Sequence, residues 1–195
     1  MSKTIEKDNW LSQLTTSIRI VIASMVICCV LYILLILGVG QLLTPYTANG
    51  SLIQNEKGEN IGSEALAQEF NNPKYFWPRP SAVGYNASAT GGSNLSPTNP
   101  ALRTRAEEIL KKYPSQEGKL IPADLVTASG SGMDPNISLT AATYQADRIA
   151  AARGIPVESV KEMIALFAKK SGGMLTPEPL VNVLLINIAL DKMGK

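Results

Sequence analysis

The sequence contains no histidine among its 195 residues. Histidine is the commonest general base near neutral pH and the commonest protein ligand of transition metals. Its absence excludes Ser-His-Asp and Cys-His catalysis, and it excludes the usual zinc hydrolase site. Carboxylate chemistry stays open in principle, but Asp and Glu form no cluster along the chain. These gaps favour a binding or accessory protein over an enzyme.

The chain also has few cysteines and a small net charge. The two cysteines, Cys28 and Cys29, both lie in an apolar run, so the rest of the chain has neither a disulfide nor a thiolate nucleophile. The net charge is +2, and no cluster of Lys and Arg interleaves with aromatic residues. Nucleic acid is therefore not an expected partner.

The longest apolar run covers residues 20–43 and contains no charged side chain. A bilayer core about 30 Å thick needs about 20 apolar residues in a helix. A cleaved signal peptide would have a shorter apolar region and a small-residue cleavage site, and residues 42–46 offer no such site. A core helix of a soluble protein would seldom avoid polar residues on every face. The run therefore predicts an uncleaved transmembrane helix in contact with membrane lipid.

The distribution of basic residues predicts the orientation of this helix. Three of them precede the run, and the next one along the chain is Lys57. The positive-inside rule then keeps residues 1–19 in the cytoplasm and places residues 44–195 outside. Residues 1–17 are polar, and we expect them to form a short and mobile segment. We expect a single-pass protein of the cell inner (plasma) membrane.

Residues 44–195 predict a helix-rich domain of mixed α/β (α+β) class. Capping Ser, Asn or Pro residues and terminating Gly or Pro residues indicate helices over residues 64–70, 100–112, 139–153 and 156–172. A short strand is expected at residues 51–53, with a turn after it at 56–58. Residues 120–127 predict a short extended or helical piece, and residues 180–193 a strand that leads into a final helix.

Two stretches rich in Gly, Ser and Asn stand out in this domain. Residues 71–99 are long for a loop but contain four aromatic residues, which argues for an ordered loop packed on the domain or on a partner. Residues 125–135, LVTASGSGMDP, invite comparison with a phosphate-binding loop. They lack its lysine and its glycine spacing, so a tight turn before a capped helix is the better interpretation.

Three polar residues, Gln145, Arg148 and Arg153, lie on the helix predicted over residues 139–153. Gln145 and Arg148 are three positions apart and therefore share a face. They can bind an anion together. They can equally solvate the surface of the helix, which is what such residues more commonly do.

Short blocks of sequence carry a family resemblance along the domain. They are residues 48–53 (ANGSLI), 79–82 (RPSA) with Tyr85 and Asn86, 91–95 (GGSNL) with Asn99 and Pro100, 124–132 (DLVTASGSG) with 134–138 (DPNIS), Ala142, Gln145, Arg148 and 150–153 (AAAR), and 181–184 (VNVL) with Asn187 and 189–191 (ALD). In this order they closely resemble the KdpC family, the C subunits of the Kdp-type potassium-transporting ATPase of bacteria and archaea.

The resemblance implies membership of a complex that imports potassium at low external concentration, driven by ATP. Its other members would be a potassium-selective channel-like subunit, a P-type ATPase subunit and a small lipid-facing peptide. The C subunit would be non-catalytic, needed for assembly, and a catalytic chaperone that raises the ATP affinity of the ATPase subunit. It would hold no metal and no stably bound cofactor, because ATP acts through the partner and potassium is the transported ion.

Two hypotheses arise for the domain. In the first it caps the outer mouth of the potassium-selective subunit through a loop over residues 85–99. The candidate contacts there are Tyr85, Asn86, Gly91, Gly92, Ser93, Asn94 and Asn99. In the alternative it is a cytoplasmic regulator that binds nucleotide directly through Gln145 and Arg148. Because ATP is absent outside the membrane, the predicted orientation favours the first, and we expect any effect on ATP affinity to be indirect.

Overall fold

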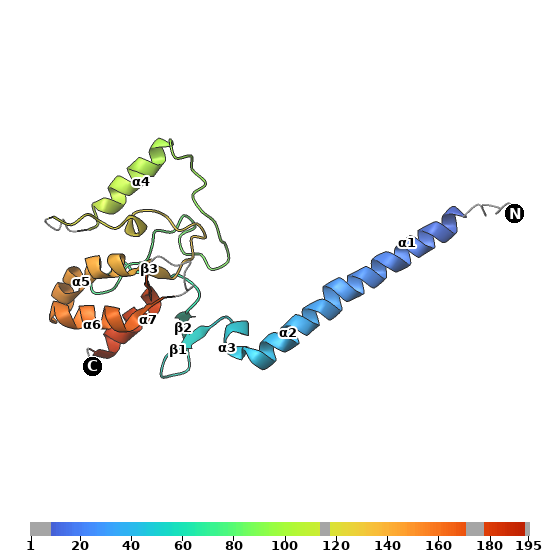
Figure 1. The fold of residues 1–195 in the computed structure, drawn as a ribbon, viewed down its shortest axis with the longest axis horizontal. Helices are drawn as coiled ribbons and strands as arrows, with labels where there is room; N and C mark the ends of the chain where they lie inside the picture. The colour runs from blue at the N-terminus through green and yellow to red at the C-terminus, as the bar shows by residue number, and fades with distance from the viewer. Residues whose placement is uncertain (1–8, 114–117, 171–177, 194–195) are drawn as a thin grey trace. The chain divides into compact units, whose positions relative to one another are not determined.

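The computed structural model describes residues 9–113, 118–170 and 178–193 of the chain. The chain divides into two compact units, Met1–Ser51 and Leu52–Lys195. The first contains one long apolar helix, and the second is a helix-rich domain with two small sheets (Figure 1). The predicted class, an N-terminal membrane helix and then a helix-rich α+β domain, is confirmed.

The first unit is dominated by a continuous helix, Trp10–Leu43, of 34 residues. It consists of α1 (Trp10–Met25), a π-helical stretch η1 (Val26–Leu31) and α2 (Tyr32–Leu43), and a short helix α3 (Pro45–Ala48) comes after it. The most apolar window has a mean hydropathy of 3.2, and none of its residues is buried by the rest of the protein. The helix is therefore long and apolar enough to cross a membrane.

The helix begins at Trp10, well before the charge-free run. The prediction of a mobile polar segment up to residue 17 is therefore wrong from Trp10 onward, while residues 1–8 lie outside the described ranges. Polar residues are tolerated here because two of them bond within the helix. The Thr15 hydroxyl donates to the Leu11 carbonyl at 2.7 Å, and the Thr16 hydroxyl donates to the Ser12 carbonyl at 2.9 Å.

The second unit is built around three helices that lie side by side in Figure 1. Its elements are β1 (Leu52–Gln54), β2 (Asn60–Ser63), α4 (Pro100–Leu110), η2 (Ala123–Leu125), β3 (Asn136–Ser138), α5 (Leu139–Arg153), α6 (Val157–Phe167), β4 (Ala168–Lys169), β5 (Leu180–Asn182) and α7 (Val183–Met193). Apolar side chains of α5, α6 and α7 form the core, among them Ile149, Ile164 and Ile186. Helix α4 stands apart from these three (Figure 1).

The sheets are small. Strands β1 and β2 form an antiparallel hairpin, whose turn contains Gly58 at a φ of +78°. The other sheet has the antiparallel order β3-β5-β4, and Val181 in its centre pairs with both Ile137 and Ala168. This sheet fixes the start of α5 and the start of α7, because each helix continues directly from a strand.

Most predicted helix ends agree with the structure because their caps form. The Asn99 side chain accepts a hydrogen bond from the Ala101 amide at the start of α4, and the Ser138 hydroxyl accepts one from the Ala141 amide at the start of α5. Gly154 ends α5 in the left-handed conformation, at a φ of +66°. The strand and final helix expected over residues 180–193 are present as β5 and α7.

Two predicted helices are wrong in whole or in part. Residues 64–70 form a turn and irregular backbone, because Ser63 bonds locally to the Ala65 amide and the Ala67 amide donates to the Met133 carbonyl instead of to its own segment. So few residues rarely repay the cost of starting a helix. The helix predicted to close near Gly172 ends at Phe167, since the next two residues pair with β5 as β4. Residues 171–177 lie outside the described ranges.

Candidate interaction site

The aromatic segment (residues 73–77, PKYFW) runs across the second unit without regular structure, and side chains bind its backbone. All five of its carbonyl oxygens accept hydrogen bonds from side chains of α5 or α7. We call the four residues that supply these donors the clamp: Gln145, Arg148 and Arg153 from α5, and Asn187 from α7. A buried carbonyl such as that of Phe76 needs such a partner, and here no strand of a sheet supplies it.

Two amide side chains bind the aromatic segment as a neighbouring strand would. The Asn187 amide oxygen accepts from the Phe76 N–H at 2.8 Å, and its nitrogen donates to the Phe76 carbonyl at 3.0 Å. Gln145 repeats this arrangement on Trp77, at 2.8 and 3.2 Å. Both amides are almost fully buried, with exposures of 2% for Asn187 and 1% for Gln145. Side-chain amides suit this role because each carries one acceptor and one donor group.

Arg148 joins the same segment from the side. One guanidinium nitrogen donates to the carbonyls of Pro73 and Tyr75, and the other donates to the Gln145 amide oxygen at 2.6 Å. The guanidinium also stacks on the Trp77 ring, 3.8 Å from its centroid. Burial lowers the pKa of Arg148 to about 10, while interaction with Tyr113 raises it. The group therefore stays charged at neutral pH.

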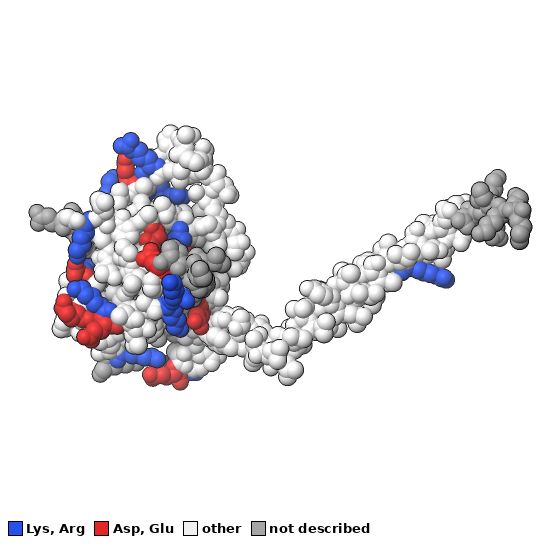
Figure 2. Space-filling model, viewed as in Figure 1, with Lys and Arg blue, Asp and Glu red and all other residues white. Residues whose placement is uncertain are grey.

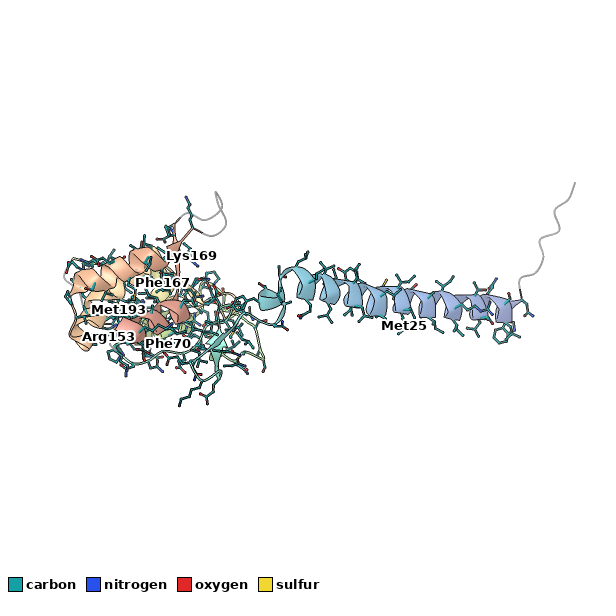
Figure 3. The ribbon with its side chains drawn as sticks, turned by 90° about the horizontal axis from the view of Figure 1, so that it is seen from below. Met25, Phe70, Arg153, Phe167, Lys169 and Met193 are labelled. Atoms are coloured by element: carbon teal, nitrogen blue, oxygen red, sulfur yellow. The ribbon has the colours of Figure 1, made fainter. Side chains whose placement is uncertain are left out.

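Arg153 connects the aromatic segment to the end of α7, and Figure 3 labels Arg153 and Met193, the last residue of α7. It donates to the Lys74 and Leu190 carbonyls at 2.8 and 2.9 Å and to the Asp191 carboxylate at 2.8 Å. The Tyr75 hydroxyl donates to the same carboxylate at 2.8 Å. Burial alone would raise the pKa of Asp191, but the hydrogen bonds from Arg153 and Tyr75, with the charges of Arg153 and Lys74, bring it below its ordinary value.

These contacts overturn one interpretation of Gln145, that its side chain solvates the helix surface. The expectation that they solvate the helix surface is wrong for Gln145, which is buried and has its acceptor and donor groups both engaged. The two residues do share a face, as their spacing predicted, and Arg148 bonds directly to Gln145. That face binds the chain's own backbone in this structure.

The chain immediately after the aromatic segment is attached to the Gly/Ser loop (residues 128–135). The Ser129 amide donates to the Pro80 carbonyl at 3.0 Å, and the Ser81 hydroxyl donates to the Gly132 carbonyl at 2.7 Å. The two glycine-rich stretches singled out in the sequence are thus brought together by the fold. Each supplies hydrogen-bonding groups to the other.

The candidate contact residues lie on the polar loop (residues 85–99), and its first half is held in place. The Gly91 amide donates to the Ser131 carbonyl at 2.8 Å. A Cβ at Gly92 would stand 3.1 Å from the Gly130 carbonyl oxygen, so the backbones approach closely there. Because these contacts fix the backbone at Gly91 and Gly92, the neighbouring exposed part of the loop has a defined position.

Tyr85 starts the polar loop in a left-handed conformation, with a φ of +56°. Its amide donates to the Ser81 hydroxyl oxygen at 3.0 Å, and its own hydroxyl donates to the Arg79 carbonyl at 2.9 Å. Burial and the charge of Glu69 raise the pKa of Tyr85 to about 12. Left-handed backbone at a bulky residue is uncommon and persists where neighbouring contacts hold it. Tyr85 therefore acts as an anchor of the loop, with its ring half-buried.

The remaining candidates are more accessible. Asn86 and Asn94 are exposed, Ser93 is partly exposed, and Asn94 adopts a φ of +49°. The Asn86 side chain accepts from the Ser88 amide at 3.0 Å, which shapes the local turn. Asn99 closes the loop as the cap of α4. The structure thus divides the candidate contact residues into two groups. Some of them hold the polar loop in place, and the others form its exposed polar surface.

Two amides of the Gly/Ser loop bond within the loop itself. The Gly132 and Met133 amides donate to the hydroxyls of Ser129 and Ser131, at 2.9 and 3.1 Å. The tight-turn interpretation is therefore confirmed, although the short strand β3 comes before the capped helix α5. In the described ranges, no three side chains of His, Cys, Asp or Glu gather as a metal site.

Sequence reasoning missed the role of Asn187 and the ion pair between Arg79 and Asp134 at 3.2 Å. A signal for Asn187 was available, since it is a single amide within the apolar stretch VLLINIAL. A polar residue on the buried face of a helix usually has a hydrogen-bond partner. The sequence could not indicate that this partner would be the backbone of Phe76.

Comparison with known proteins shows the family to which the chain belongs. The sequence profile of the family described as "KdpC: K+-transporting ATPase, c chain" matches residues 14–192. A Potassium-transporting ATPase KdpC subunit of Parvibaculum lavamentivorans is 48% identical over 177 residues, which cover 91% of this chain and 95% of that protein. The subunit of Geobacter sulfurreducens is 41% identical over 187 residues, covering 94% and 99%. This chain therefore belongs to the KdpC family, the c chains of the K+-transporting ATPase.

Proposed function

We propose that this chain is a non-catalytic accessory subunit of a high-affinity, ATP-driven potassium import complex. Family membership over residues 14–192 carries the proposal, because the relatives are named as subunits of a potassium-transporting ATPase. We propose that the chain is needed for assembly and that it stimulates the ATPase subunit by raising its ATP affinity. The other members are a potassium-selective channel-like subunit, the P-type ATPase subunit and a small lipid-facing peptide.

The polar loop is the surface that we assign to the potassium-selective subunit. Its anchors, Tyr85 and Gly91, hold a run of accessible amides and hydroxyls on a rigid base. A photocrosslinker in place of Asn94, in the assembled complex, should capture the potassium-selective subunit. The same group in place of the exposed Glu162 on α6 serves as the control. Capture of only cytoplasmic parts of the ATPase subunit from position 94 would refute this assignment.

We further propose that the second unit lies outside the inner membrane. The bias of basic residues before the apolar helix supports this orientation. After replacement of Cys28 and Cys29 by Ala, a single cysteine at Thr90 should react with a membrane-impermeant maleimide in spheroplasts. Reaction only after lysis would reverse the orientation and bring the domain to the ATP side.

The contacts of Gln145 argue against the alternative, direct nucleotide binding. A nucleotide would have to displace Trp77 backbone bonds from a side chain that is 1% exposed. We therefore propose that the effect on ATP affinity is indirect, through the assembled complex.

A matched pair of variants tests that point. Gln145→Ala and Asn187→Ala each remove one amide from the clamp, so an indirect effect should change the ATP dependence of the complex alike in both. An azido-ATP analogue should label neither the wild-type chain nor the variants. Labelling of the wild-type chain that only Gln145→Ala abolishes would establish direct contact.

A further inference from the structure

A cavity of about 420 Å³ is lined by residues of the β1–β2 hairpin and of α7. Ile53 and Ile61 of the hairpin and Ile188 of α7 form its apolar part. Sites for small molecules typically have volumes of about 300–1,000 Å³ and combine apolar walls with a few polar groups. This cavity, which we call the hairpin cavity, therefore has the size and the lining of a ligand site.

Charged side chains of both signs complete the lining of the hairpin cavity. They are Glu56 and Lys57 from the hairpin turn, with Asp191 and Lys192 from α7. Asp191 is already paired with Arg153. Within the described ranges, none of the other three side chains forms an ion pair with the protein. Unpaired charges of both signs beside an apolar wall fit an amphiphile whose head carries both charges.

The chain enters the hairpin directly from the end of the apolar helix. Gln41, in the last turn of α2, and Asn49 bind each other through their side-chain amides, at 3.1 and 3.2 Å. The Asn49 side chain also donates to the Pro45 carbonyl at 2.7 Å. These bonds fold the chain back, so that Asn49 lies beside the last turn of the helix. Strand β1 begins three residues later, at Leu52.

Tyr46 holds Ser51, the residue before β1, close to the same helix end. The Ser51 amide donates to the Tyr46 carbonyl at 3.0 Å, and the Tyr46 hydroxyl donates to the Ser51 carbonyl at 3.2 Å. Tyrosines at the ends of membrane helices collect at the level of the lipid headgroups. From Ser51 the chain reaches Ile53 in two residues, at most about 7 Å. The hairpin therefore starts at the headgroup layer, whichever way the remainder of the second unit is turned.

We propose that the hairpin cavity binds a phospholipid with a primary amine in its headgroup, phosphatidylethanolamine, from the membrane that Trp10–Leu43 crosses. The isoleucines contact the glycerol and the first methylenes of an acyl chain. Lys57 and Lys192 pair with the phosphate, and Glu56 accepts hydrogen bonds from the ammonium group. The inference goes beyond the proposed function, because it requires only that the apolar helix lies in a membrane.

Glu56 is the group that selects among headgroups. The choline of phosphatidylcholine carries a positive charge but no N–H, so it cannot donate a hydrogen bond to the carboxylate. The head of phosphatidylglycerol carries no cation, so the Glu56 charge stays unpaired beside an anionic lipid. Only the ethanolamine head supplies both a phosphate for the lysines and an N–H donor for Glu56.

Photolabelling of the full chain in phosphatidylcholine nanodiscs tests the proposal. Each sample contains the same small fraction of one diazirine-bearing probe: phosphatidylethanolamine, phosphatidylcholine or phosphatidylglycerol. Mass spectrometry then locates the labelled peptides. Residues 52–63 should take up the ethanolamine probe about tenfold more than either other probe, because one hydrogen bond to a charged group changes affinity by about that factor. Peptides of the apolar helix should take up all three probes alike, which verifies insertion.

A matched pair of variants locates the site. Glu56→Gln should abolish the preference for the ethanolamine probe. Glu59→Gln, in the same hairpin but outside the cavity lining, should retain it. Equal labelling of residues 52–63 by the three probes would overturn the proposal. So would a labelled helix beside an unlabelled hairpin, or a preference that Glu56→Gln leaves unchanged.

Discussion

Single side chains in the second unit form the backbone hydrogen bonds that a neighbouring strand would form in a sheet. Gln145 and Asn187 each pair with both backbone groups of one residue, Trp77 and Phe76 respectively. An isolated loop residue buried in this way would leave a donor and an acceptor without partners, at a cost of about 1–3 kcal/mol for each group. Two amides thereby allow an irregular segment to cross the core.

Replacing Gln145 by Ala should lower the free energy of unfolding by about 2–4 kcal/mol, because the partly buried N–H and carbonyl of Trp77 and one donor of Arg148 lose their partner. Urea unfolding of the full chain in detergent measures this loss. Thr143→Ala, on the exposed side of the same helix, should stay within about 0.5 kcal/mol of the wild type. Equal stabilities of the two variants would contradict the clamp.

Asp191 should make stability depend on acid pH. Its pKa in the folded chain lies below the ordinary 3.8, mainly through hydrogen bonds from Arg153 and Tyr75 that outweigh burial. The folded state therefore binds fewer protons than the unfolded one, so the stabilisation is complete above the ordinary pKa and is lost as pH falls through the folded value. The stability difference between wild type and Asp191→Asn should shrink below about pH 4. A difference independent of pH would rule out this linkage.

At the scale of elements, the fold is organised by two strands that each continue into a helix. Strands β3 and β5 pair with each other, and they lead directly into α5 and α7. The clamp residues come from these two helices, so the sheet sets their separation. The Gly/Ser loop precedes β3, and its Ser131 carbonyl accepts a hydrogen bond from the Gly91 amide of the polar loop. Loop position is thus determined by elements distant in sequence.

Two glycines of the Gly/Ser loop should respond differently to the same change. A Cβ at Gly132 would stand 2.6 Å from Val83 and 2.8 Å from the Gly91 carbonyl, and φ there is +70°. Gly132→Ala should cost about 2–4 kcal/mol and loosen the polar loop. At Gly130 nothing lies within 4 Å of an added Cβ, so Gly130→Ala should be nearly neutral. Limited proteolysis within residues 85–99 compares them, and equal cleavage rates would refute the close approach.

At the scale of the whole molecule, the chain consists of two units with different tasks. The hydrophobic core belongs entirely to the second unit, since every residue of its cluster lies after Leu52. The first unit has an exposed apolar surface instead. Charges of both signs are interspersed on the visible face of the second unit (Figure 2), which suits a soluble body.

The second unit should therefore fold without the helix. Residues 52–195, expressed alone, should be soluble and should unfold in urea at the same midpoint as this unit in the full chain. Circular dichroism of both proteins in the same detergent buffer makes the comparison. A midpoint clearly lower in the isolated unit would mean that the first unit contributes to its stability.

The membrane helix, most of the caps and the family could all be predicted from the amino-acid sequence. These features are local: an uncharged run of sufficient length, a Ser or Asn before a helix, and short blocks in a fixed order. It also brought Gln145 and Arg148 onto one face, because helical spacing alone does that. It misplaced the helix start at Trp10 and the helix over residues 64–70, where side-chain and long-range bonds outweighed composition.

The roles of the polar residues became clear from the folded structure, because their partners are distant in sequence. Gln145 and Arg148 bind a backbone segment about 70 positions away along the chain, and Asn187 binds one about 110 positions away. Residue types state which groups can donate or accept, but packing brings a particular partner within 3 Å. The sequence could therefore indicate that residues 85–99 form a recognition loop. Which groups hold this loop in place is known only from the fold.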